Sequence, residues 1–369
     1  MSHLTNSYSY KLLVNLSYLL SKPTGTTTYI LNLLPYLQSL EPTLLISQNL
    51  APYNCHLVPN GLTPEQGLKG HFRRMLWTQL QLPGIYKEQQ SNFLFSPIPE
   101  APLSSNCRYI VTVHDLIPLR FPKRFSPLTP YFRYYIPQVL DQAQHIICDS
   151  IATAKDISHF FQIRADKITP ILLAHNAEDF RPLNLPKGTA TLSPYFLYIG
   201  RHDPYKNLHR VINAFAALDI CRECELWIAG PKDRRYTPKL QTQVEELGLT
   251  HQVKFLDYVP YDQLPTLINQ AIALVFPTLW EGFGLPVLEA MACGTPVITS
   301  NLSSLPEVAG DAALLVNPYN TQEITEAMQA VATDSSLRSG LSTLGINRAS
   351  QFSWAKTGKA TVEVIQRYL

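Results

Sequence analysis

The stretch that decides the fold runs from Phe276 to Val297 and reads FPTLWEGFGLPVLEAMACGTPV. An apolar run ends near Phe276, and a short loop with glycines at 282 and 284 follows it. Pro286 comes next, and proline is favoured in the first turn of a helix. Glycines let backbone N–H groups approach a ligand closely, and a helix N-terminus favours phosphate. The stretch therefore predicts a strand, a loop and a helix that together hold a phosphate.

Two glutamates in this stretch are candidates for contacts with a phosphate-bearing ligand. Glu281 lies in the loop, beside the position expected for the group attached to the phosphate. Glu289 lies about one turn into the expected helix, further along a bound nucleotide. Either acid alone has a second interpretation, because an acid near a helix N-terminus also stabilises the helix dipole. The pattern as a whole carries the functional interpretation.

Short apolar runs alternate with longer helical stretches on both sides of this segment, as in βαβ units with parallel sheets. Strands are expected in the first half at 11–16, 42–47, 53–58, 92–96, 108–114, 145–149 and 168–173. Strands are expected in the second half at 195–200, 225–230, 252–256, 272–276, 296–299 and 313–316. Helices are expected at 25–40, 66–82, 127–143, 150–161, 206–219, 237–248, 260–270, 285–293 and 320–333. The fold class is therefore α/β, with two Rossmann-like doubly wound domains that face each other across a ligand-binding cleft.

The length of 369 residues suits two domains of roughly 150–200 residues each. Residues 181–194 contain three prolines and a glycine, which predicts an interdomain linker. The expected division is an N-terminal domain over 1–185 and a C-terminal domain over 186–350. An amphipathic helix over 351–369 is expected to return to the N-terminal domain.

Composition narrows the possible partners. Hydrophobic residues make up 46% of the chain and charged residues 16%, and the formal net charge is +2. A nucleic-acid partner is not expected, because it would require a concentrated basic surface. No run of apolar residues is long enough to cross a bilayer, so a cytoplasmic location is expected. Bases mixed with aromatic residues at 71–77 and 120–125 leave peripheral contact with the inner membrane face open.

The pattern Glu-Gly-Phe-Gly-Leu-Pro-x-x-Glu-Ala-x-Ala-x-Gly-x-Pro-Val at 281–297 resembles the signature of family-four retaining glycosyltransferases of the GT-B fold. The resemblance covers nearly the whole chain and is nearest to a subgroup rich in mannosyltransferases. It implies that the loop faces the hexose of a nucleotide-sugar donor and that Glu289 binds the ribose. The loop residues concerned are Glu281, Gly282, Phe283 and Gly284, while the helix that begins at Leu285 faces the pyrophosphate.

A second motif, Gly-Arg-His-Asp-Pro-Tyr-Lys-Asn at 200–207, contains two basic residues and lies at the end of the expected strand 195–200. Arg201 and Lys206 lie five positions apart, so both side chains can reach one pyrophosphate, Arg201 with a fork and Lys206 as a point charge. The motif matches the family's Gly-x-x-x-x-Lys-Asn pattern. These cations would stabilise the leaving diphosphate without a metal. No Asp-x-Asp sequence occurs in the chain, so neither a metal nor another cofactor is expected.

Further site residues are expected outside these two motifs. His114 follows an apolar strand, and the resemblance places a histidine there near the donor sugar, while Asp115 orients the loop or faces the acceptor. Gly25 stands where relatives carry a glycine pair near the diphosphate, although Thr24 replaces the first glycine. Val259 lies where relatives line the nucleobase pocket. His114, Glu281, Arg201 and Lys206 are the candidate catalytic residues.

The sequence therefore predicts a retaining glycosyltransferase that transfers a hexose to a glycan, a lipid-linked acceptor or a small molecule. GDP-mannose is the favoured donor, and UDP-hexoses remain open. A sugar-nucleotide 2-epimerase, a phosphorylase and a non-catalytic sugar-nucleotide-binding protein are alternatives on the same scaffold. A nicotinamide-dependent oxidoreductase is disfavoured, because no Gly-x-Gly-x-x-Gly follows a strand.

Overall fold

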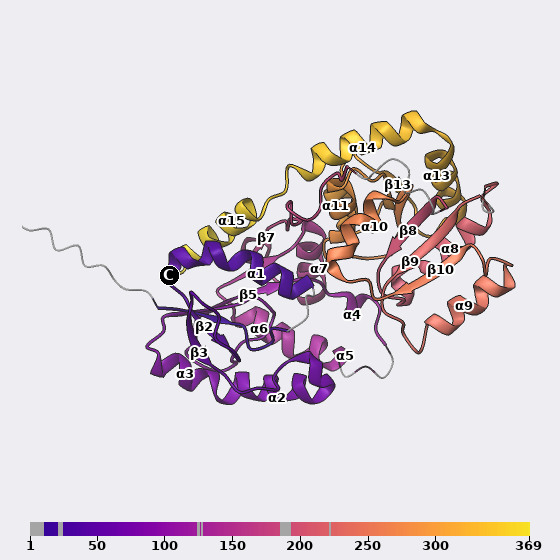
Figure 1. Ribbon diagram of the computed structural model, residues 1–369. Helices are drawn as coiled ribbons and strands as arrows, with labels where there is room; N and C mark the ends of the chain where they lie inside the picture. Colours follow the sequence, from indigo (N-terminus) through magenta and orange to yellow (C-terminus); the bar gives the residue numbers. More distant parts are fainter. Residues whose placement is uncertain (1–10, 21–24, 124–125, 127, 185–192, 221–222) are drawn as a thin grey trace, which may run out of the picture. The chain divides into compact units, whose positions relative to one another are not determined.

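The computed structural model describes residues 11–20, 25–123, 126, 128–184, 193–220 and 223–369 (Figure 1). They form two compact units. Unit 1 comprises the described residues up to Leu172 together with Trp354–Leu369, and unit 2 comprises Leu173–Ser353. The chain therefore enters unit 2 once, leaves it once, and ends in unit 1.

Unit 1 contains a seven-stranded parallel sheet with the strand order β3-β2-β1-β4-β5-β6-β7. Its strands are β1 (Leu12–Asn15), β2 (Thr43–Ile46), β3 (Asn54–Leu57), β4 (Phe93–Ser96), β5 (Tyr109–Val113), β6 (His145–Cys148) and β7 (Ile168–Pro170). Every residue of β1, β4, β5 and β6 is buried. Burial on both faces explains why these strands read as unbroken apolar runs.

Eight α-helices of the described chain belong to unit 1. They are α1 (Gly25–Leu37), α2 (Gly67–Leu80), α3 (Leu82–Glu88), α4 (Ile117–Arg120), α5 (Leu128–Pro130), α6 (Ile136–Gln142), α7 (Ile151–Phe161) and α15 (Trp354–Gln366). A single π-helical turn, Tyr131–Tyr135, joins α5 to α6.

The last helix, α15, packs closely on the first helix, α1. A Cβ atom at Gly358 would lie 2.3 Å from Cγ of Tyr36, so only glycine permits this approach. The hydroxyl of Thr357 donates to the carbonyl of Leu172 at 2.7 Å. These contacts join the C-terminal helix to the N-terminal part of the chain.

Unit 2 contains a six-stranded parallel sheet with the order β10-β9-β8-β11-β12-β13. Its strands are β8 (Tyr195–Ile199), β9 (Glu225–Ala229), β10 (Val253–Asp257), β11 (Ala273–Phe276), β12 (Val297–Ser300) and β13 (Leu314–Val316). Counted within the unit, this order is 3-2-1-4-5-6, which is the strand order of the Rossmann fold. Its switch point lies between β8 and β11, and the carboxyl ends of these two strands lead into the two predicted donor motifs.

Seven α-helices of the described chain belong to unit 2. They are α8 (Leu208–Ala216), α9 (Thr237–Glu246), α10 (Leu264–Asn269), α11 (Leu285–Ala292), α12 (Leu305–Ala309), α13 (Thr321–Thr333) and α14 (Ser335–Ala349). Apolar residues of α8, α9 and α13 pack with alternate residues of the strands in one buried core. No helix in the described part of the chain is long and apolar enough to cross a membrane.

The strands and most helices lie where the sequence predicts them, and the α/β class with two parallel sheets is confirmed. The boundary between the units falls at Leu172 and Leu173, earlier than the expected division at 185/186. Asn269 explains the difference: its side-chain oxygen accepts from Leu183 N and its amide donates to the Arg181 carbonyl, so the segment before 185 is already bound to unit 2. Much of the expected linker, 185–192, lies outside the described residues.

Candidate active site

The carboxyl end of β8 approaches the neighbouring strand very closely. A Cβ atom at Gly230 would lie 1.9 Å from the carbonyl oxygen of Gly200. Gly200 also donates its N–H to the carbonyl of Ala229 at 2.9 Å. The absence of a side chain at 230 therefore allows the loop after β8 to begin directly against β9.

The loop after β8 folds back over its own strand. The buried hydroxyl of Tyr198 lies 3.1 Å from the carbonyl of Lys206 and 3.5 Å from that of Arg201, and it donates toward both. Asn207 adopts a left-handed conformation with φ of 63°, which asparagine tolerates better than most residues. These contacts hold the two predicted phosphate ligands, Arg201 and Lys206, at the two ends of one rigid turn.

Asn207 also joins this loop to the loop that carries Glu281. Its side-chain amide donates to the carbonyl of Pro277 at 2.9 Å and to that of Pro318 at 2.7 Å. The backbone adds a third link, because Leu279 N donates to the carbonyl of Tyr205 at 2.8 Å. The two residues of the Lys-Asn pair therefore have different roles. Asn207 is completely buried and holds the two loops together, while Lys206 faces the site.

Two serines hold the loop around Glu281. The N–H of Glu281 donates to Oγ of Ser303 at 3.1 Å, and the hydroxyl of Ser304 donates to the carbonyls of Glu281 and Phe283. Gly284 then caps α11 with φ of 107°, and a Cβ atom there would lie 2.6 Å from a methyl carbon of Leu305. The strand, loop and helix predicted from the sequence are therefore present.

Lys206 and Glu281 form an ion pair. The ammonium nitrogen of Lys206 lies 2.8 Å and 3.0 Å from the two carboxylate oxygens of Glu281. The two side chains are only 13% and 10% exposed, so the pair is poorly screened by water. The ring of Phe276 lies 5.4 Å from the ammonium group and forms one wall around it. The structure thus brings together two of the four predicted catalytic residues.

Arg201 lies in a more open position. Its guanidinium pairs with Asp203 at 3.1 Å, and the arginine side chain is 64% exposed. The side chain of Asp203, by contrast, is only 3% exposed. Arg201 is therefore free to change partner when an anion arrives.

Glu289 is partly buried in α11, and its carboxylate accepts no hydrogen bond from any residue that the structure describes. Burial raises its pKa from the ordinary value of 4.5 to about 7. Tyr261 lies near enough that the charge of Glu289, together with burial, raises the pKa of its hydroxyl. Glu289 is thus a carboxylate that still lacks hydrogen-bond donors.

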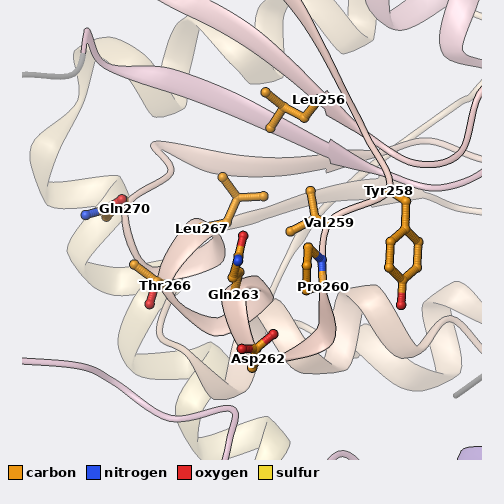
Figure 2. A pocket seen from close by; sticks show the side chains of 9 residues that line it. All are labelled: Leu256, Tyr258, Val259, Pro260, Asp262, Gln263, Thr266, Leu267 and Gln270. Atoms are coloured by element: carbon orange, nitrogen blue, oxygen red, sulfur yellow. The ribbon is translucent and has the colours of Figure 1, made fainter. Parts of the chain in front are cut away.

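A pocket of about 500 Å³ opens between the end of β10 and helix α10 (Figure 2). It is lined by Leu256, Tyr258, Val259, Pro260, Asp262, Gln263, Thr266, Leu267 and Gln270. Val259 was predicted to line the nucleobase pocket, and Figure 2 shows it beside Pro260 and near Leu267. Lys206 and Glu281 do not line this pocket.

In unit 1, His114 follows β5 and contacts the residue that follows β6. Nδ1 of His114 lies 2.8 Å from a carboxylate oxygen of Asp149, and Nε2 lies 2.9 Å from the carbonyl oxygen of Pro97. The ring of Tyr29 meets the imidazole edge-on at 5.0 Å. Burial alone would lower the pKa of His114, but the charge and hydrogen bond of Asp149 outweigh it and the pKa is raised.

Three further predicted site residues, Asp115, Gly25 and Phe283, lie in different parts of the structure. A carboxylate oxygen of Asp115 accepts from Ile117 N at 3.0 Å, which fits the role of orienting its own loop. Gly25 is the first residue of α1, whereas Thr24 lies outside the described residues. The ring of Phe283 is buried 6.1 Å from that of Phe352, so only its backbone is available to a ligand.

Comparison with known proteins identifies the family. The family model described as "Glycosyl transferases group 1" matches residues 183–348, and the one described as "Glycosyltransferase Family 4" matches residues 23–174. O-antigen chain mannosyltransferase B of Escherichia coli is 32% identical over 69% of this chain and 69% of that protein. The chain belongs to the family-four glycosyltransferases.

Two further relatives of this glycosyltransferase are named mannosyltransferases. An O-antigen chain mannosyltransferase of Salmonella typhimurium is 31% identical over 60% of each chain. The serotype-specific mannosyltransferase WbdA of Escherichia coli is 28% identical over 70% of this chain. The match covers only 33% of WbdA.

Solved structures show that the glycosyltransferase has the GT-B fold. Sucrose-phosphate synthase from Thermosynechococcus elongatus superposes with a TM-score of 0.78 at 18% identity and covers 97% of this chain and 98% of its own. Anabaena HepE in complex with UDP and glucose superposes with a TM-score of 0.74 at 17% identity, over 97% of this chain and 100% of that one.

Sequence reasoning missed three side chains that hold the candidate site of this glycosyltransferase. They are Asp149, which contacts His114, and the two serines 303 and 304. Asp149 had one usable signal, because it ends an expected strand and polar residues at the carboxyl ends of parallel strands gather at one edge. Among the described residues, no three His, Cys, Asp or Glu side chains are grouped so that they could hold a metal ion.

Proposed function

We propose that this glycosyltransferase transfers a hexose from a nucleotide-diphosphate-sugar with retention of the anomeric configuration, and that unit 2 binds the donor. The observation that carries the proposal is the pair of loops joined by Asn207, which present Lys206, Glu281 and the N-terminus of α11 to one region. Lys206 and the helix N-terminus supply positive charge for a diphosphate. Glu281 supplies a carboxylate that can accept hydrogen bonds from sugar hydroxyls.

In the proposed reaction, the bond between the anomeric carbon and the diphosphate oxygen breaks first. Lys206 and Arg201 stabilise the charge that develops on the diphosphate. The acceptor hydroxyl then attacks from the same face, its oxygen bonds to the anomeric carbon, and its proton passes to a phosphate oxygen. Lys206 must leave Glu281 in part to reach the phosphate, and this frees the carboxylate for the sugar. No metal takes part in this scheme.

Two features of unit 2 suit the nucleoside. The carboxylate of Glu289 lacks donors in the described structure, and the two hydroxyls of a ribose would supply them. The pocket beside Val259 has the volume of a small-molecule site and a mixed apolar and polar lining, which suits a nucleobase. The relatives named mannosyltransferases favour GDP-mannose as the donor. The likeness to HepE with UDP and glucose keeps UDP-hexoses as the second candidate.

Unit 1 is the proposed acceptor-binding half, and the acceptor is a glycan or a lipid-linked glycan. The relatives that act on the O-antigen chain favour this class. His114 and Gly25 lie at the carboxyl edge of the unit 1 sheet, where Rossmann-like folds bind ligands. Asp115 contributes by holding the loop after β5.

Helix α2 supports the further proposal that unit 1 rests on the inner face of a membrane. Four large apolar side chains are exposed at intervals of four residues: Leu68 at 63%, Phe72 at 56%, Leu76 at 41% and Leu80 at 75%. Two exposed bases, Lys69 and Arg73, accompany them, and the helix Gly67–Leu80 contains no acid. Such a basic amphipathic face suits anionic lipid.

A donor panel tests the proposed function. Thermal denaturation is measured with GDP-mannose, UDP-glucose and other nucleotide sugars, since a bound donor stabilises the fold. The stabilising donor is then incubated with candidate glycan acceptors in buffer containing a chelator. The expected result is a new glycoside with the anomeric configuration of the donor. An inverted product, free epimerised sugar nucleotide, or a requirement for added Mg²⁺ or Mn²⁺ would contradict the proposal.

A further inference from the structure

The hydrogen bonds of His114 restrict where its protons can be. A backbone carbonyl only accepts hydrogen bonds, so the contact of Nε2 with the Pro97 oxygen at 2.9 Å requires a hydrogen on Nε2. The contact of Nδ1 with Asp149 at 2.8 Å holds a second proton, whichever of the two atoms carries it. Nε2 is therefore a donor in either case, and neither ring nitrogen offers a free lone pair for a general base.

Asp149 is well placed to impose this state. It follows β6, it is 4% exposed, and it lies opposite His114 because β5 and β6 are paired neighbours in the sheet. Its second carboxylate oxygen has no hydrogen-bond partner among the residues that the structure describes. Thr153 in α7 fixes the histidine backbone, since its hydroxyl donates to the His114 carbonyl at 3.4 Å.

Two carboxylates near His114 favour its protonated form. The charges of Asp149 and Asp115 both raise the pKa of the imidazole. The hydroxyl of Tyr29, whose ring meets the imidazole edge-on, lies beside the same group. Negative charge near an imidazole stabilises its protonated form.

We propose that Asp149 is a positioning residue that keeps Nε2 of His114 protonated, so that His114 acts on the substrate only as a hydrogen-bond donor. When substrate binds, an oxygen of the substrate replaces the Pro97 carbonyl as acceptor, while Nδ1 keeps its hydrogen bond with Asp149. This deepens the proposed function and rests on it. It assigns the acceptor's proton to the leaving phosphate, because His114 has no site to take it.

The protonation of His114 is measured first, without any turnover. Nitrogen NMR of protein labelled at histidine is recorded from about pH 6 to about pH 8, the range in which an ordinary histidine loses its charge. The signal is assigned by its loss in His114→Gln. Nε2 of His114 is expected to remain protonated across this range. Most histidines are already neutral at about pH 7.5. An unprotonated Nε2 of His114 at or below that pH would overturn the proposal.

The variant Asp149→Asn provides the second measurement. The asparagine can either donate to or accept from Nδ1, so His114 should titrate with a pKa lower than in the natural protein. Turnover should fall about tenfold or more and decline further as pH rises, while the KM for the donor changes little. Asp149→Glu should restore part of the loss. An unchanged pH profile in Asp149→Asn would contradict the positioning role.

Asp156→Asn is the matched control. Asp156 is a buried carboxylate of α7, the helix that follows Asp149, and its ion-pair partner is Arg120. Its pH profile should follow that of the natural protein. If it shifts in the same way as Asp149→Asn, the effect is structural and the proposal fails. If the natural protein shows the protonated ring but no transfer, the proposed function fails while the assignment of the protons stands.

Discussion

The ammonium group of Lys206 lies 2.8 Å from the carboxylate of Glu281, although 75 positions separate the two residues in the chain. The carboxyl ends of β8 and β11 are neighbours in the sheet, and Asn207 ties their loops together. Each charge therefore serves as the partner of the other until a ligand arrives. The diphosphate and the sugar of a donor would replace both partners at once.

Removal of either charge should damage both stability and turnover. Lys206→Ala or Glu281→Ala leaves one poorly solvated charge unpaired, which should cost on the order of 3 kcal/mol of unfolding free energy. Each should also lower turnover at least about a hundredfold, the scale of one lost electrostatic contact in the transition state. The double variant Lys206→Met with Glu281→Leu should regain stability but not turnover. Urea unfolding and initial rates measure the two effects, and near-natural rates in either single variant would refute the site.

Arg201 should behave differently from Lys206. Because its side chain is 64% exposed, Arg201→Ala should lower the unfolding free energy less than Lys206→Ala does, although its partner Asp203 is only 3% exposed. Loss of a charged hydrogen bond to the diphosphate should raise the KM for the donor by roughly tenfold or more. Arg201→Lys should recover only part of the loss, since lysine lacks the fork. Arg164→Ala, at another exposed arginine, is the control and should leave the KM unchanged.

The affinity for the donor should depend on pH through Glu289. Its pKa of about 7 in the ligand-free protein means that the carboxyl is partly protonated at neutral pH. Ribose hydroxyls bind the ionised form best, so binding should release a proton and tighten as pH rises from about 6 to about 8. Titration calorimetry with the intact nucleotide sugar in buffers of different ionisation enthalpy measures the proton. Glu289→Gln should abolish both the proton release and the pH dependence.

The same group also affects stability without ligand. Its folded pKa exceeds the ordinary value of 4.5, so its contribution is fully present below about pH 4.5 and is lost as pH rises through 7. Glu289→Gln should therefore stabilise the ligand-free protein more at pH 8 than at pH 6. Thermal denaturation at the two pH values gives the difference, and an equal effect at both would contradict the raised pKa.

The close approach at Gly230 predicts a sharp contrast between two glycines. Gly230→Ala places a methyl group against the Gly200 carbonyl and should lower the unfolding free energy by roughly 1–3 kcal/mol. Gly340→Ala is the control, because nothing lies within 4 Å of its added methyl group in α14. That change should stabilise the protein by about 0.5–1 kcal/mol, since glycine weakens a helix interior. Equal effects of the two changes would argue against the packing of β8 and β9.

The apolar face of α2 should bind anionic vesicles. Sedimentation with phosphatidylglycerol vesicles is expected to remove the protein from solution, whereas phosphatidylcholine vesicles should not. Phe72→Ser with Leu76→Ser should abolish the binding, while donor binding stays intact. Leu344→Ser, at a leucine of α14 that is 43% exposed, is the control and should bind like the natural protein. Dimerisation through α2, detected by light scattering and lost in the same variant, would contradict the membrane proposal.

The sheets were predictable because their strands are buried on both faces and read as unbroken apolar runs. Helix α14 was not predicted, because Ser335–Ala349 is rich in serine and glycine and shows weak periodicity. It packs through small residues instead, with a Cβ at Gly345 expected only 3.4 Å from Met291. Such a contact depends on a partner far away in the sequence.

Site residues that belong to a local sequence motif were predictable. Contacts that depend on the tertiary fold were not. The loops around Lys206 and Glu281 have the spacing of a β-loop-α unit, which a sequence shows directly. The partnership of His114 with Asp149 follows from the pairing of β5 with β6, and no spacing between the two residues reveals it. The ion pair of Lys206 with Glu281 also depends on strand order, so the sequence predicted its members but not their contact.

The packing of α15 on α1 makes the chain's architecture an insertion: the segment Leu173–Ser353 is spliced into unit 1 between its seventh strand and its final helix. Chimeras that exchange donor specificity between relatives therefore need two junctions, near 172 and 353. A single crossover near 172 would exchange every later residue, including α15. It would therefore also replace Gly358, the residue that allows α15 to pack against Tyr36 of α1. In such a hybrid, unit 1 would be destabilised because its final helix no longer fits α1. This loss would have nothing to do with donor recognition.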